Sequence, residues 1–181
     1  LSNVNLSGTD LSGMDLTGAI LTGTDLGYSN LAGADLSGAL LVRTNLSHSN
    51  LTDVNFKHTT FFHVILTGAN LTDVNLRGIN LSGKDLTGVI LTGANIQNTI
   101  LTGANLTDAN FKDTTLFQVN FNGANLTGVI LTGAVLSSSS LEGANLTGAD
   151  LSNADLTGTI LTDAILTDTI LNCVGHPICT S

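Results

Sequence analysis

Residues Leu66 to Leu76 read LTGANLTDVNL, with a leucine at every fifth position. The spacing continues in both directions, because every fifth residue from Leu1 to Leu171 is Leu, Phe or Ile, at 35 positions in one unbroken frame. On an α-helix a five-residue step rotates a side chain by about 140°, and on a strand an odd step sends it to alternate faces. The pattern therefore predicts a chain that bends once per five residues and points each of these side chains toward a common axis.

The other four positions of the repeat support this interpretation, if the recurring Leu is called position 1. Position 3 holds 18 of the 20 glycines, and Asp, Asn or His fills twelve of the remaining sites, which indicates a turn with positive φ. Position 4 is Ala, Val, Thr or Ser in 32 of 35 repeats and is expected to point inward, where little room is left. Position 2 is mostly Ser or Thr and position 5 mostly Asn or Asp, so both are expected to face outward or to bond to the turn backbone.

These features resemble the pentapeptide repeat family, whose motif, A(D/N)LxG or close to it, is seen in GANLTGAD from Gly143 to Asp150. The resemblance covers residues 1–174 and implies an all-β fold, a right-handed quadrilateral β-helix of about nine coils with four pentapeptides in each. Residues 175–181 are expected to form a C-terminal cap or tail. Stacked leucines and backbone hydrogen bonds between coils would hold such a solenoid together.

Composition and charge narrow the functional classes. The formal net charge of -9 disfavours direct contact with nucleic acid or an anionic membrane, and no apolar run approaches the roughly 18 residues of a spanning helix. No catalytic triad, phosphate-binding glycine loop or paired-carboxylate cleft stands out, so we expect no enzyme activity, no catalytic residue, no cofactor and no metal. The chain starts in register without Met, which indicates a processed or trimmed N-terminus.

Family resemblance frames the expected role. Some pentapeptide repeat proteins imitate duplex DNA and bind type II topoisomerases such as gyrase, and none is characteristically an enzyme. We expect a rigid scaffold or protein-interaction module with an unidentified protein partner, from a bacterial or cyanobacterial source, as a monomer or a weak end-to-end dimer. A gyrase-binding DNA mimic is the alternative. Against it, the acidic residues gather near both ends, whereas four of the five basic residues lie in the middle and would interrupt a continuous negative surface.

The least regular stretch is NFKHTTFFHVIL, from Asn55 to Leu66. Phe56 and Phe61 occupy position 1 and are expected in the core. His58 and His63 occupy position 3 and are interpreted as turn residues, with a metal-binding or pH-sensitive pair as the alternative. Position 2 places Phe62 outside, near basic residues if one coil has 20 residues. The candidate interaction patch comprises Phe62, Arg43, Lys57, His58, His63 and Arg77.

Three further features need an interpretation. A second copy of the motif, NFKDTTLFQVNF from Asn110 to Phe121, puts Phe117 in the place of Phe62, but the offset of 55 residues sends the two rings to different faces. Lys84 falls in the inward position 4, so we expect a local distortion there, with the ammonium reaching out between coils or meeting Asp85. A column of threonines could bind ice, although Thr also simply suits a β-like position. These threonines are Thr67, Thr87, Thr107, Thr127, Thr147 and Thr167.

The repeat stops in the C-terminal segment LNCVGHPICTS. A disulfide between Cys173 and Cys179 is expected to stabilise this end by roughly 2 to 3 kcal/mol, although a metal site through His176 is an alternative. The disulfide favours the periplasm, the thylakoid lumen or the secreted space, and free thiols would indicate the cytoplasm. An apolar collar near this end, covered by the tail or used in end-to-end contacts, is formed by Ile160, Ile165 and Ile170.

Overall fold

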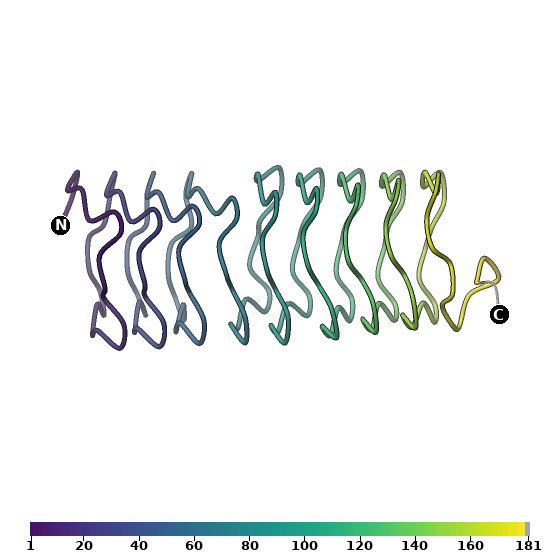
Figure 1. Cartoon of the computed structure of the whole chain (residues 1–181), viewed down its shortest axis with the longest axis horizontal. Coiled ribbons are helices and arrows are strands. Elements are labelled where there is room, and N and C mark those ends of the chain that lie inside the picture. Colours follow the sequence, from purple (N-terminus) through teal and green to yellow (C-terminus); the bar gives the residue numbers. More distant parts are fainter. Residues whose placement is uncertain (180–181) are drawn as a thin grey trace.

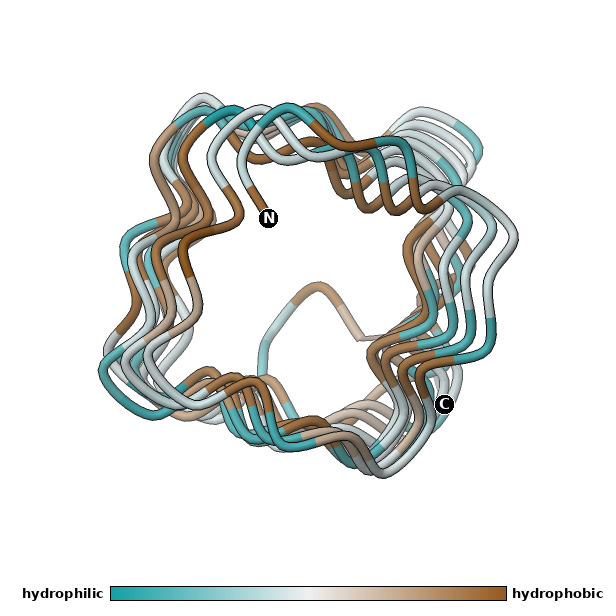
Figure 2. Cartoon of the chain, turned by 90° about the vertical axis from the view of Figure 1, so that its left-hand side faces the viewer, coloured by the Kyte–Doolittle hydropathy of each residue, from teal (hydrophilic) through white to brown (hydrophobic). Residues whose placement is uncertain are grey.

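The chain forms a four-sided solenoid whose coils stack along one axis (Figures 1 and 2). The structure is a computed structural model that describes residues 1–179. Within this range no α-helix forms, and the β-structure consists of single parallel bridges between residues at position 5, separated by turns. Apart from the last bridge, between Asp155 and Val174, these bridges join residues 20 apart, as between Asn5 and Asp25, so four repeats separate one stacked position from the next.

Position 3 makes every corner of the solenoid. All 34 residues at this position from Asn3 to Asp168 have positive φ, and those that are not glycine include residues as large as Tyr28 and Arg43. The prediction of a turn at position 3 is confirmed. Because a residue with a Cβ pays a steric cost in this conformation, the bend must be enforced by the stacking of neighbouring coils.

Positions 1 and 4 both point inward, as the sequence predicts. Position-1 side chains from Leu21 to Leu156 are buried with few exceptions, and the position-4 residues between them are mostly buried as well. Hydroxyls at position 4 are satisfied inside the tube: Thr44 Oγ1 donates to the carbonyl of Leu21 at 2.8 Å, one coil earlier. No buried side-chain nitrogen or oxygen in the described range lacks a partner, so the narrow core carries no unpaired polar group.

Position-5 side chains form hydrogen bonds that link one pentapeptide to the next. The Asn or Asp side chain accepts a hydrogen bond from the backbone N–H two residues later, as Asp150 Oδ1 does from Ser152 at 2.9 Å. The hydroxyl and the backbone N–H of Ser152, and then the hydroxyl of Thr132, hold the pKa of the Asp150 carboxyl below its ordinary value. Position-5 side chains therefore bond to the turn backbone, whereas several position-2 hydroxyls bond to the position-5 side chains, as Thr147 Oγ1 does to Asn145 Oδ1 at 2.6 Å.

The C-terminal segment crosses the far end of the tube (Figure 2). The predicted disulfide between Cys173 and Cys179 is present, with an S–S distance of 2.14 Å, and Ile178 packs against the end of the core. His176 Nδ1 lies 3.3 Å from the backbone N–H of Ile178, which donates to it. Residues 180 and 181 of the predicted tail lie outside the described range. No helix long and apolar enough to cross a membrane is found in the part of the chain that the structure describes.

The predicted apolar collar stays open to solvent. Ile160, Ile165 and Ile170 are 52, 50 and 51% exposed, so the described part of the tail does not cover them. A weak end-to-end contact through this collar stays a prediction.

Stacked corners make one glycine more sensitive to substitution than another. The rings of Tyr28 and His48 stack with centroids 4.9 Å apart, and a Cβ added to Gly68 would collide with the imidazole of His48. We expect Gly68→Ala to lower the free energy of unfolding by about 2–3 kcal/mol, of which about 1–2 reflects the left-handed φ and the rest the displaced ring. Chemical denaturation measures this loss.

Gly103→Ala is the matched control, because its φ of +64° is similar and no atom lies within 4 Å of the added Cβ. It should cost only the backbone term of about 1–2 kcal/mol. Measured relative to His48→Ala alone, the double variant Gly68→Ala with His48→Ala should lose only this smaller amount. Equal losses in the two single variants would show that the stacked corner has no energetic weight.

The Asp150 carboxylate predicts a small acid sensitivity. Because its pKa is lowered in the folded state, its stabilising contribution is complete above the unfolded pKa near about 4 and is lost as the pH falls through the folded pKa. Asp150→Asn should change stability at pH 7 by less than about 1 kcal/mol, since Asn145 makes the corresponding bonds to Thr147 and Thr127 through its amide. Denaturation curves from pH 7 to pH 2 should decline less steeply for the variant. An unchanged decline would contradict this assignment.

Candidate interaction site

The ladder of bridges is interrupted on three successive sides of the solenoid. In the described range no bridge joins residue 55 to 75, 60 to 80 or 65 to 85, although Asn50 pairs with Asn70, and Asn70 with Ile90. We call this interrupted interface, between residues 55–66 and residues 75–85, the opening. The stack of turns is visibly less regular at this level, where the trace passes from blue to teal (Figure 1). The opening begins at the sequence NFKHTTFFHVIL, the least regular stretch of the chain.

Oversized inward side chains account for the opening. Ile79 and Lys84 occupy position 4, where they stand one coil above Thr59 and Val64. Below them, adjacent repeats carry Phe56 and Phe61 in place of leucines, with ring centroids 5.0 Å apart. Adding volume to a packed interior forces the backbone to move, and here the coils separate instead of stacking.

In the second copy of the motif a phenylalanine at the matching place, Phe111, does not open the stack, although Leu116 stands there in the place of Phe61. Phe111 and Phe121 also occupy position 1, yet both are fully buried and their rings are 6.1 Å apart. One coil above this copy, position 4 holds the small residues Ala134 and Ser139, and bridges such as that from Asn110 to Ile130 are intact. The opening therefore depends on the coil above as well as on the phenylalanines.

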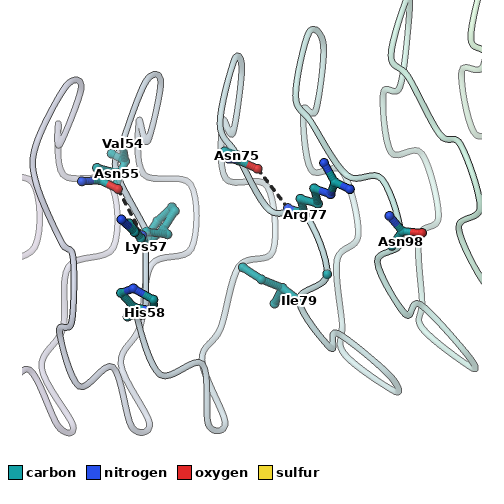
Figure 3. A pocket seen from close by; sticks show the side chains of 10 residues that line it. Val54, Asn55, Lys57, His58, Asn75, Arg77, Ile79 and Asn98 are labelled. Atoms are coloured by element: carbon teal, nitrogen blue, oxygen red, sulfur yellow. Dashed lines mark hydrogen bonds between the residues drawn. The ribbon is translucent and has the colours of Figure 1, made fainter.

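The opening contains a cavity of about 580 Å³ whose mixed polar and apolar lining includes two cationic side chains (Figure 3). It is lined by residues 54–58, which we call the lower lip, by Asn75 and residues 77–79, which we call the upper lip, and by Asn98. Lys57 projects from the lower lip and Arg77 from the upper lip, and neither forms an ion pair within residues 1–179. Their backbone N–H groups donate to Asn55 Oδ1 and Asn75 Oδ1, each at 3.1 Å.

The structure divides the predicted interaction patch into two groups. Lys57, His58 and Arg77 line the cavity. The other three residues form what we call the Phe62 corner, made of Arg43, Phe62 and His63, which does not line it. Phe62 is 57% exposed and packs edge-on against His63 at 4.2 Å, and the N–H of Arg43 donates to the Phe62 carbonyl at 2.9 Å. No three His, Cys, Asp or Glu side chains in the described range gather as a metal site.

The family model for pentapeptide repeats matches the chain in eight copies, over residues 1–38, 29–68, 69–108, 101–133, 109–148 and 130–168. The chain belongs to the pentapeptide repeat family. Among solved structures it is similar to HetL, a pentapeptide repeat protein involved in heterocyst differentiation regulation in the cyanobacterium Nostoc sp. strain PCC 7120. The identity is 27% and the TM-score 0.67, over 97% of this chain and 92% of HetL.

A second similar structure is QnrB1, a plasmid-mediated fluoroquinolone resistance protein. Its identity to this chain is 22% and the TM-score is 0.56, over 88% of this chain and 92% of QnrB1, a likeness that bears on the fold alone. No curated protein sequence matches the chain. Right-handed quadrilateral β-helices are the known fold of this family, in agreement with the four-sided outline of the pentapeptide repeat tube seen along its axis (Figure 2).

Two expectations about this pentapeptide repeat protein need refinement. The distortion expected at Lys84 is present, but the side chain is half-buried and forms no ion pair with Asp85 in the described range. Phe56 is 3% exposed and belongs to the core, whereas Phe61 is only half-buried, because the opening removes the coil that would cover it. The sequence interpretation missed Ile79 and Asn98 as cavity residues, although the unusual size of Ile79 at position 4 was a signal for the first.

Three threonines in the middle of the column have hydroxyls that are already bonded within the repeat. Thr107 Oγ1 donates to Asn105 Oδ1 at 2.7 Å and accepts from Asn125 Nδ2 at 2.9 Å, and Thr87 and Thr127 make the same pair of bonds. Hydroxyls with both a donor and an acceptor partner are poorly placed to order a lattice of water. This geometry weighs against ice binding.

Proposed function

We propose that this pentapeptide repeat protein is a rigid, non-enzymatic interaction module that contacts a protein partner through the Phe62 corner. The observation that carries this proposal is the 57% exposure of a phenylalanine held at a fixed place beside Arg43. Exposed aromatic rings beside arginine are enriched where proteins bind one another. The turn at His63 and the bond from Arg43 fix the backbone around the ring, so that little order would be lost on binding.

Gyrase is the defined candidate partner, because some members of the family imitate duplex DNA. The acidic balance supports this second candidate: the net charge is -9, and hydrogen bonds from Ser12, Thr17 and Ser37 lower the pKa of three exposed carboxyls near the N-terminal end. Those carboxyls, which stay charged at neutral pH, belong to Asp10, Asp15 and Asp35. The cationic opening at mid-rod weighs against it, since a DNA mimic needs a continuous negative surface.

We also propose that the protein works in an oxidising compartment, such as the periplasm, the thylakoid lumen or the secreted space. The supporting observation is the bond between Cys173 and Cys179, the two cysteines of the chain. Native material alkylated before and after reduction should show by mass spectrometry that both thiols become reactive only after reduction. Thiols already free in rapidly quenched native material would place the protein in a reducing compartment instead.

Phe62→Ser tests the proposed interaction surface. Ser is common at position 2, so the variant should fold with a free energy of unfolding within about 1 kcal/mol of the original. Loss of an aromatic anchor should weaken partner capture by at least about tenfold. The measurement is capture from an extract of the source organism on immobilised protein, followed by supercoiling assays with purified gyrase as the first defined partner.

Phe117→Ser is the matched control, because Phe117 occupies the corresponding place in the second copy, is 38% exposed and lies on a different side. It should leave capture unchanged. Equal capture by the original protein and by both variants would remove the Phe62 corner from consideration. Unfolding of Phe62→Ser would instead show that the ring has a structural role.

A further inference from the structure

We propose that the opening binds an extended acidic peptide, which completes the interrupted ladder as an additional strand between the two lips. The proposal rests on the function proposed above, in that the peptide would belong to a protein partner. It concerns the side of the opening from Val54 to His58, which lines the cavity, and not the Phe62 corner, which borders the opening on the next side. It also involves a distinct mode of recognition, based on backbone hydrogen bonds.

Closed coils show which backbone groups the opening leaves free. One coil below the lower lip, Leu36 N–H donates to Asn55 O at 2.9 Å and Gly38 N–H to Lys57 O at 2.8 Å. In return, Asn55 N–H donates to Ala34 O at 3.1 Å. Each side of a closed interface thus exchanges bonds in both directions, as adjacent parallel strands do.

The two lips lack these exchanges within the described range. On the lower lip, the N–H groups of Phe56 and His58 and the carbonyl of Val54 have no backbone partner one coil above. On the upper lip, the carbonyls of Asn75 and Arg77 and the N–H of Asn75 have none one coil below. The lips therefore present two facing strand edges, each with donors and acceptors, which is the template that an extended peptide recognises.

The charge of the lining selects an acidic occupant. Lys57 and Arg77 stand on opposite lips without an anionic partner in the described range. The rest of the chain carries an excess of acidic residues, so this cationic site differs from its surroundings. Asp or Glu side chains on a bound strand would reach both cations, and such complementarity favours selection over basic or neutral segments.

Shape and hydrogen-bonding capacity favour a peptide over a small anion. A phosphate or carboxylate ion only accepts hydrogen bonds, so it would leave the free carbonyls of Val54, Asn75 and Arg77 unpaired. A strand of about five residues spans roughly 17 Å and can follow the five-residue side from Val54 to His58. The volume of about 580 Å³ falls within the range of roughly 300–1,000 Å³ typical of pockets that bind ligands.

The test uses the whole protein and a defined probe, the capped peptide acetyl-Thr-Glu-Val-Asp-Val-Thr-amide. Binding is measured by calorimetry, and its location by hydrogen exchange with mass spectrometry on residues 55–66 and 75–85. Free protein should exchange faster in these two segments than in residues 110–121, where the second copy is closed. Bound peptide should slow exchange in both lips by at least about tenfold and leave residues 110–121 unchanged.

Three controls separate charge, opening and strand pairing. Lys57→Gln with Arg77→Gln keeps the opening and should weaken peptide binding by about tenfold or more. Ile79→Ala with Lys84→Ala restores small residues at position 4, as in the second copy, and should close the lips and abolish binding while Lys57 and Arg77 remain. A peptide with the same charges but N-methylated at its central residues should bind at least about tenfold more weakly, because it lacks the donors of a strand.

Several outcomes would overturn the proposal. They are absence of binding, binding without protection of the lips, equal binding of the N-methylated peptide, and protection of the lips by inorganic phosphate or citrate to the same degree as by the peptide. The proposed function fails separately, through unchanged partner capture by Phe62→Ser. Loss of peptide binding with unchanged capture through the Phe62 corner would therefore contradict the peptide site alone. Peptide binding without any effect of Phe62→Ser on capture would contradict the proposed function alone.

Discussion

The volume of the side chains at positions 1 and 4 controls how closely one coil can lie on the next. The core of this solenoid is only the stack of inward side chains along the axis, so no second layer of secondary structure can shift to accommodate a larger side chain. Leucine at position 1 with Ala, Val, Ser or Thr at position 4 allows successive coils to exchange backbone bonds at 2.7–3.3 Å. The positive φ at every corner is sustained by this stacking, because isolated repeats would have no reason to accept the steric cost.

Much of the fold could be predicted from the repeat frame. The frame assigns each residue to a corner, an inward site or an outward site, and the structure confirms these assignments because each depends on local geometry that repeats without change. The disulfide between Cys173 and Cys179 was predictable for a related reason, since the two cysteines lie six residues apart at the point where the repeat ends. Features of this kind depend on residues close together in the chain, so they can be predicted from a single sequence.

The opening was not predictable in the same way, because it depends on residues in two coils at once. Lys84 indicated a distortion, and Ile79 is also large for position 4, but its effect depends on Thr59 and the phenylalanines in the coil below it. Phe61 was expected to be buried by its position alone, and its half-exposure reflects the coil above it. A rule written for one repeat at a time cannot sum side-chain volumes across an interface between coils. The sequence therefore did not separate the three patch residues that line the cavity from the three of the Phe62 corner.

The second copy of the motif shows why this mismatch has a functional meaning. Residues 55–66 and 110–121 share the pattern NFK-TT-F, yet only the first faces large residues at position 4, and only the first is open. A closed coil offers a partner mainly its outward side chains, because the neighbouring coils already pair most of its backbone N–H and carbonyl groups. Where the inward side chains are too large for the coils to stack, the backbone groups of two strand edges become available, with Lys57 and Arg77 beside them. The bridges of the neighbouring coils remain intact. In a molecule built from one repeated unit, the departure from regular packing is where recognition of a peptide backbone can arise.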